Sequence, residues 1–180
     1  TPIPAHQEFV PWRLQIAVYG IGLFSTTMFY MAAVVVPLWV ASLESSPFLV
    51  GMVLGSRHLL PLFLSINGGA LMDRLGGRRV MVFFAIVGVI IPLLFPIMPW
   101  IWAVLVLQMI AGLADSMGWL GAQTLIGQYM RGSTIYTGRL SFTSRFGHLL
   151  APPVIGQLWD AFGSTWAFVG LSVWGFGILV

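Results

Sequence analysis

The chain contains long stretches in which no side chain carries a charge. The run Leu14–Leu43 has 30 such residues and the run Val80–Ala114 has 35. A helix needs about 20 mostly apolar residues to cross the roughly 30 Å hydrocarbon core of a bilayer. Both runs are therefore long enough to span a membrane. The second is too long for one helix, and the proline-rich stretch 92–99 divides it into two.

The composition agrees with a membrane protein and excludes several other classes. Charged residues make up 7% of the chain and hydrophobic residues 58%, and the mean hydropathy is +0.95. Soluble domains carry about 25% charged residues, because a soluble surface must be polar. A soluble enzyme and a disordered tail are therefore excluded. The net charge is only +3 without a basic run, so no nucleic-acid partner is expected.

The residue types that are missing narrow the chemistry further. The chain has no cysteine and its eight basic residues are all arginine. Disulfides and thiolate metal sites are thus impossible, and so is a phosphate loop that needs lysine. No two histidines have the spacing of metal ligands. We expect a protein that is not an enzyme and that has no metal and no cofactor.

These runs predict an all-α membrane protein with six transmembrane helices. Short connections make helices that are neighbours in sequence antiparallel. The predicted helices are Gln15–Ala41, Phe48–Met72, Val80–Phe95, Ile101–Tyr129, Leu140–Trp159 and Trp166–Val180.

The arginines indicate an orientation. Arginines occur at the N-terminal end and at the connections after the second and fourth helices, namely Arg13, Arg74, Arg78, Arg79, Arg131 and Arg139. The opposite connections carry Glu44 and Asp160. Because cytoplasmic loops are rich in Lys and Arg, the N-terminus is expected in the cytoplasm of a multi-pass protein of the cell membrane.

An internal repeat divides the six helices into two halves. Gly69–Gly76 follows the second helix and Gly156–Gly163 follows the fifth, and both read G-x-L-x-D-x-apolar-G. The two segments are 87 residues apart, which also superposes the first helix on the fourth. A unit of three helices ends on the opposite face of the membrane from its start. The halves are therefore predicted to be inverted repeats, an architecture typical of secondary transporters.

The segment after the second helix resembles a known family signature. Gly69, Asp73, Arg74, Gly76, Arg78 and Arg79 match the loop 2–3 motif G-x-L-a-D-R-x-G-R-R/K of the major facilitator superfamily, with Gly77 at a usually basic position. The resemblance implies that this loop latches one conformation through Asp73 and Arg78 or Arg79. Gly69 is expected to let helices approach, and Gly76 and Gly77 to form a tight turn. Asp73 is expected to cap the next helix or to pair with Arg78 or Arg79.

The fifth helix resembles a second pattern of this superfamily. Its packing motif is matched at Gly138, Gly147, Pro152 and Gly156, while Ala151 and Ile155 stand where the pattern has glycine. The resemblance implies an antiporter, and hence export of the solute. Members of the family have twelve helices, so this chain is expected to be an N-terminal six-helix half whose C-terminal half is missing. The first and fourth helices would then line a central cavity.

Charged groups within the predicted helices mark candidate sites. A charge at the bilayer centre costs about 2.5–3.5 kcal/mol on insertion scales, so such residues face a cavity or a partner. Asp115 in the fourth helix is the candidate proton site, and the alternative is a structural carboxylate paired with arginine. Candidate substrate or charge partners are Arg57, His58, Arg145 and His148. Arg145 could instead extend to the cytoplasmic interface.

Together, these features predict a secondary active transporter of a small solute, coupled to protons. Its partners would be the solute, protons, the lipid bilayer and the C-terminal half. Two alternatives remain open. One is a membrane scaffold or assembly factor that shares the fold but does not transport. The other is a six-helix half-transporter that works as a homodimer.

Overall fold

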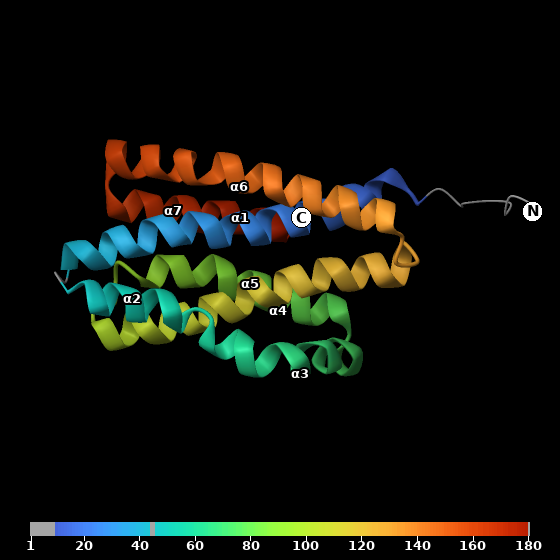
Figure 1. Ribbon diagram of the computed structural model, residues 1–180, viewed down its shortest axis with the longest axis horizontal. Coiled ribbons are helices and arrows are strands. Elements are labelled where there is room, and N and C mark those ends of the chain that lie inside the picture. The colour runs from blue at the N-terminus through green and yellow to red at the C-terminus, as the bar shows by residue number, and fades with distance from the viewer. Residues whose placement is uncertain (1–9, 44–45, 180) are drawn as a thin grey trace, which may run out of the picture.

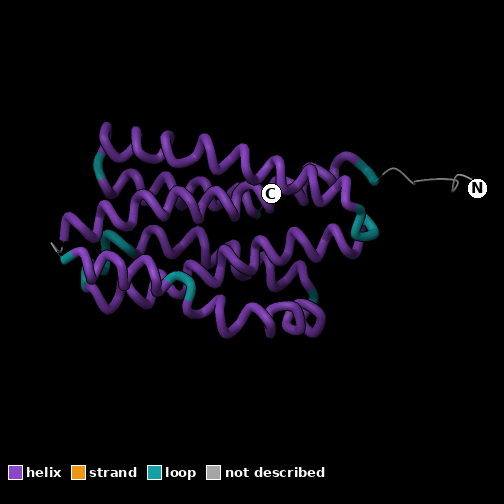
Figure 2. The backbone as a smooth tube through the Cα atoms, in the orientation of Figure 1, coloured by secondary structure: helices purple, strands orange, loops and turns teal. Residues whose placement is uncertain are grey.

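A computed structural model describes residues 10–43 and 46–179 of the chain. Within these ranges the chain forms helices joined by short connections, and no strand is present (Figure 2). The predicted all-α fold is confirmed. The helices are α1 (Trp12–Leu43), α2 (Pro47–Ser56), α3 (Leu59–Leu75), α4 (Gly77–Leu94), α5 (Ile101–Tyr129), α6 (Thr134–Phe162), α7 (Ser164–Gly175) and the 3₁₀ turn η1 (Phe176–Ile178). Glu44 and Val180 lie outside the described residues.

Four segments of the described chain are long and apolar enough to cross a membrane. They are Trp12–Leu43, Pro47–Leu64, Gly77–Leu94 and Ile101–Tyr129, and Ser164–Ile178 is a shorter apolar segment. The predicted fifth span lies within α6, which is long enough but carries more polar side chains. Large apolar side chains cover the outside of the bundle; Phe48, Trp102 and Phe142 are 74%, 75% and 73% exposed. An apolar exterior of this kind suits a lipid environment.

The predicted second helix is wrong in one respect, because it is broken at Arg57–His58 into α2 and α3. Pro61 explains the break. In a continuous helix the N–H of residue 61 would bond to the carbonyl of Arg57, but proline has no N–H and its ring clashes with that carbonyl. The chain instead turns with a bond from His58 N to Gly55 O, 3.1 Å long, and then resumes as α3. The break leaves the Arg57 carbonyl outside the regular series of i to i+4 hydrogen bonds of a helix.

The helices form two groups of three spans each. Figure 1 shows α1, α6 and α7 in one group and α2–α3, α4 and α5 in the other. α1 packs most extensively against α6, while its repeat counterpart α5 packs against α2, α3 and α4. Contacts of α1 with α5 and of α4 with α7 join the groups. Each group therefore combines helices from both halves of the internal repeat.

The repeated motif ends at a glycine with positive φ in both halves. Gly76 ends α3 with φ +87° and Gly163 ends α6 with φ +83°, and each is followed at once by the next helix. Residues with a side chain rarely adopt such φ values. The glycine at the end of each motif is thus required by the backbone.

Small residues allow the helices to approach closely around the centre of the bundle. A Cβ on Gly118 would lie 2.8 Å from the Cβ of Ser25, and one on Gly147 would lie 2.2 Å from Cγ2 of Thr27. Such contacts are typical of helix packing in membranes. They bring α5 and α6 against the middle of α1, where polar side chains are buried.

Candidate functional site

A buried ion pair joins α5 to the break between α2 and α3. Arg57 pairs with Asp115, and the two side chains are 5% and 10% exposed. A second nitrogen of the Arg57 guanidinium donates a hydrogen bond to Oε1 of Gln108, one of the buried polar residues of α5. The guanidinium also lies 5.2 Å from the ring centroid of Phe29 on α1, a cation–π distance. Arg57 thus has the partner that a charge inside a membrane requires.

Gly112 positions this ion pair. A Cβ on Gly112 would lie 1.8 Å from the carbonyl oxygen of Arg57 and 2.8 Å from its carbonyl carbon. Only glycine therefore allows α5 to pass this close to the break. Gln108 and Asp115 flank Gly112 by four and three residues and lie on the same side of α5. Both can consequently reach the Arg57 guanidinium.

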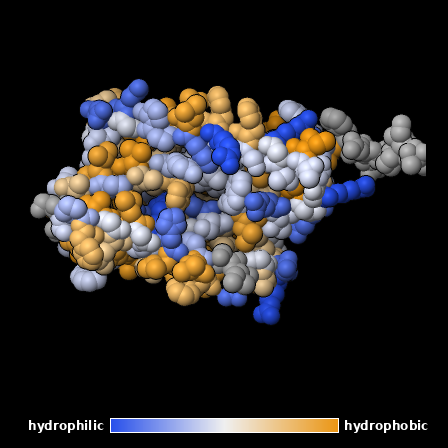
Figure 3. Space-filling view, in the orientation of Figure 1, coloured by the Kyte–Doolittle hydropathy of each residue, from blue (hydrophilic) through white to orange (hydrophobic). Residues whose placement is uncertain are grey.

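A cavity of about 360 Å³ opens beside Asp115, between α1, α5 and α6. Its lining combines hydroxyl groups, aromatic rings, one acidic side chain and two basic side chains. The lining residues are Ser25, Thr26, Phe29 and Tyr30 of α1, Asp115, Ser116 and Trp119 of α5, and Ser141, Ser144, Arg145 and His148 of α6. On the face of the molecule seen in Figure 3, hydrophilic side chains lie in a hollow along the middle, with apolar side chains around it.

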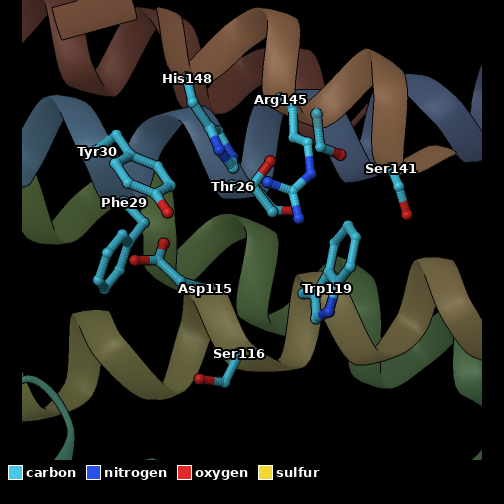
Figure 4. Close-up of a pocket in the computed structure, with 11 residues that line it drawn as sticks. Thr26, Phe29, Tyr30, Asp115, Ser116, Trp119, Ser141, Arg145 and His148 are labelled. Carbon is cyan, nitrogen blue, oxygen red and sulfur yellow. The ribbon is translucent and has the colours of Figure 1, made fainter.

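The α6 side of the cavity presents hydrogen-bond donors. Ser141, Ser144, Arg145 and His148 are spaced i, i+3, i+4 and i+7, so they share one face of the helix. Figure 4 shows Arg145 and His148 projecting from α6 toward α5, while Asp115 and Trp119 project toward them. Within the described chain, Oγ of Ser144 and Nε2 of His148 are buried without a hydrogen-bond partner.

The structure gathers three of the five titratable residues that the sequence singled out. Asp115, Arg145 and His148 line the cavity, and the His148 ring lies 4.0 Å from that of Tyr30. Arg57 lies behind the cavity, paired with Asp115. His58 is exposed at the break, 5.7 Å from the ring of Phe29, and does not line the cavity.

Three serines of the cavity were not predicted from the sequence. Ser116, Ser141 and Ser144 line it, and none of them was a candidate. The α6 residues could have been identified from their helical spacing, which places on one face of the helix Ser141, Ser144, Arg145 and His148. A polar face on a helix that must cross a membrane points inward to water or a partner.

The loop 2–3 motif forms a turn, but two of its expected contacts are absent. α4 begins at Gly77 with Gly76 as its N-cap residue, so Asp73 does not cap it. In the described part of the chain Asp73 also has no ion pair with Arg78 or Arg79, and all three are exposed. Gly77 is helical, and only Gly76 has a positive φ. The turn is therefore built by one glycine, which leaves the charged side chains, Arg74 included, at the surface.

Close helix contacts occur at different glycines from those expected. Gly69 has open space where a Cβ would stand, whereas a Cβ on Gly68 would lie 2.5 Å from Cε of Met117. In α6, Gly147 packs against α1, but Gly138 and Gly156 also have open space. Pro152 lies inside α6, which continues through it to Phe162. Within the described residues Gly147 therefore makes a close contact and Gly69, Gly138 and Gly156 make none, and the packing role of these glycines stays a prediction.

A helical bundle with an apolar exterior and a polar cavity between its spans defines a multi-pass membrane protein that can hold a small solute. The sequence model of the Major Facilitator Superfamily matches residues 18–180. The chain belongs to this superfamily, whose members are membrane transporters of small solutes. Comparisons with curated proteins and with solved structures gave no match.

Proposed function

We propose that this chain is the N-terminal six-helix half of a secondary active transporter that exchanges a small solute for protons. The observation that carries the proposal is the carboxylate of Asp115, which borders the cavity on one side and pairs with Arg57 on the other. A carboxylate in this position can contact a solute in the cavity, and it also contacts the charge of Arg57 at the helix break. Solute binding and proton binding can therefore influence each other.

The ion pair provides a mechanism for the coupling. A proton and the Arg57 guanidinium compete for the same carboxylate of Asp115. Protonation removes the charge that holds Arg57, and Gln108 then remains as its hydrogen-bond partner. Because Arg57 lies at the junction of α2 and α3, release of the pair frees the two segments to change their angle. A two-state element of this kind can alternate the access to a cavity.

Flux in proteoliposomes made from the full-length natural protein tests this proposal. Solutes are screened under an imposed pH gradient, and transport should depend on that gradient. Replacing Asp115 with Asn should abolish the dependence, because an amide cannot exchange a proton. Exchange of the solute without a pH gradient should persist, which distinguishes loss of coupling from loss of folding.

Other outcomes of the same assay favour the alternatives. Movement that does not depend on the gradient would indicate a uniporter with a structural Asp115. A correctly folded protein that moves no solute in a broad panel would indicate a scaffold or assembly factor. A six-helix unit that is active as a dimer would indicate a homodimeric half-transporter.

The two ends of the bundle support an orientation in the membrane, and the surface of α6 supports a position for the second half. The start of α1, the α3–α4 turn and the α5–α6 turn lie at one end (Figure 1). We place this arginine-rich end in the cytoplasm of the cell membrane by the positive-inside rule. The open space at Gly138 and Gly156 of α6 is available for close packing of a C-terminal half.

The loop 2–3 motif supplies a separate prediction. Asp73 is exposed and unpaired within the described unit, so its latch partner would lie in the second half. Replacing Asp73 with Asn should reduce transport while changing stability by less than about 0.5 kcal/mol. The matched control is Asp160→Asn, because Asp160 is the exposed counterpart of Asp73 at the opposite end of the bundle. Equal transport by the Asp73 variant and the natural protein would contradict the latch.

A further inference from the structure

We infer that the solute of this transporter is an organic anion, held by Arg145 on α6 with its apolar part against the aromatic rings of the cavity. The inference rests on the proposed transport function and names the class of solute. It is carried by the distribution of charges and of unused hydrogen-bond donors around the cavity. Neither the family match nor the loop motif specifies that class.

The charges of the cavity favour an anion. Asp115 has its counterion, because Arg57 pairs with it from behind. Arg145 has no ion pair or hydrogen bond among the described residues, although it lines the same cavity. The Asp115–Arg57 pair is neutral overall, so Arg145 leaves the lining with an uncompensated positive charge. A guanidinium with free N–H groups binds a carboxylate, sulfonate or phosphate through two parallel hydrogen bonds.

The hydrogen-bond donors point to the same conclusion. Ser25 and Thr26 on α1 donate to Ile21 O at 2.7 Å and to Gly22 O at 2.6 Å, so their protons are already used. Ser116 on α5 likewise donates to Gly112 O at 2.8 Å. By contrast, Oγ of Ser144 and Nε2 of His148 have no partner and flank Arg145 in sequence. The unused groups therefore gather on α6, where an anionic group could accept from the Ser144 hydroxyl, and from Nε2 of His148 when that nitrogen carries the proton.

The aromatic rings that α1 and α5 contribute to the cavity suit an apolar or aromatic part of the solute. Phe29, Tyr30 and Trp119 line the cavity, and Trp119 projects from α5 toward Arg145 in Figure 4. Pockets for small molecules are mostly apolar, with a few polar groups that fix the orientation. A volume of about 360 Å³ accommodates a single ring with one anionic substituent. The expected solute is thus a small amphipathic anion.

Equilibrium binding to the purified full-length protein in nanodiscs tests this inference. The probes are benzenesulfonate, its neutral analogue benzenesulfonamide and the cation phenyltrimethylammonium, measured by calorimetry against empty nanodiscs. Benzenesulfonate should bind at least about tenfold more tightly than the amide, since a charge-assisted bond to Arg145 is lost in the amide. The cation should bind most weakly. Equal or tighter binding of the amide or the cation, or no binding of benzenesulfonate, would overturn the inference.

Substitutions at Arg145 locate the binding charge. Arg145→Gln should weaken the binding of benzenesulfonate by about tenfold or more, and Arg145→Lys should weaken it less because the charge remains. Arg145 is exposed and unpaired in the described unit, so both variants should fold. The control is Arg13→Gln, which removes the same charge at the exposed start of α1. Unchanged affinity in Arg145→Gln would reject this site.

This assay is independent of the coupling mechanism. Binding at equilibrium requires no gradient and no movement of the transporter between states. Failure of anion binding would therefore leave proton-coupled transport of another solute class standing. Anion binding without gradient-dependent flux would instead reject the proposed function and keep the binding site.

Discussion

Replacing Arg57 with Met should destabilise the six-helix unit by about 3–5 kcal/mol, because it leaves the buried carboxylate of Asp115 without a counterion. A second substitution, Asp115→Leu, should restore most of that loss. Two apolar side chains of similar volume need no desolvation of charge, and such replacements are often neutral or stabilising. The free energy of unfolding in detergent, measured for both single variants and the double variant, gives the coupling between the two residues.

A control at the surface distinguishes the loss of a buried ion pair from the loss of an exposed charge. The control is Arg13→Met, which removes an exposed arginine at the start of α1 and should change stability by less than about 0.5 kcal/mol. If Arg57→Met behaved like this control, the ion pair would contribute nothing measurable. The pairing of α5 with the helix break would then need another explanation.

Gly112→Ala is expected to be the most damaging glycine substitution in α5. The new Cβ would lie 1.8 Å from the carbonyl oxygen of Arg57, which is backbone and cannot rotate away. α5 or the α2–α3 junction must therefore move, at a cost of about 1–3 kcal/mol or more. The displacement should also separate Arg57 from Asp115, so that proton coupling falls together with the melting temperature.

Gly127 provides a matched control in the same helix. It is exposed, and a Cβ there would have no neighbour within 4 Å. Gly127→Ala should therefore stabilise α5 by about 0.5–1 kcal/mol, since alanine restricts the unfolded chain and favours a helix. Similar melting temperatures for the two alanine variants would show that α5 does not approach Arg57 as closely as the structure indicates.

The sequence predicted the long helices well, because lipid imposes a simple length requirement on them. Residues 101–129 were predicted as one helix, and α5 has the same bounds. The break after Ser56 was missed, since the segments on both sides are apolar and together have the length of one membrane span. Pro61 was the local signal, and it acts on the carbonyl four residues earlier rather than at its own position.

The residue types of the candidate site were predictable from the sequence, and an arginine was one possible partner of Asp115, but the sequence could not select that pairing. A charge inside a membrane needs a partner, so Arg57 and Asp115 could both be singled out. Their pairing depends on the close approach of α5 at Gly112, 55 residues from Arg57 in the chain, which no local pattern encodes. The contacts expected of Asp73 failed for a similar reason. A loop motif gives the turn, whereas the partners of its exposed charges depend on surfaces outside the described unit.

The most direct test of the central claim is whether a solute gradient alone drives protons through the transporter. Proteoliposomes with a trapped pH indicator are given a gradient of a solute identified by the flux screen, without any initial pH gradient. We expect a change of the internal pH with the natural protein and none with Asp115→Asn. Solute movement by the natural protein without any change of internal pH would contradict proton coupling and leave Asp115 as a structural partner of Arg57.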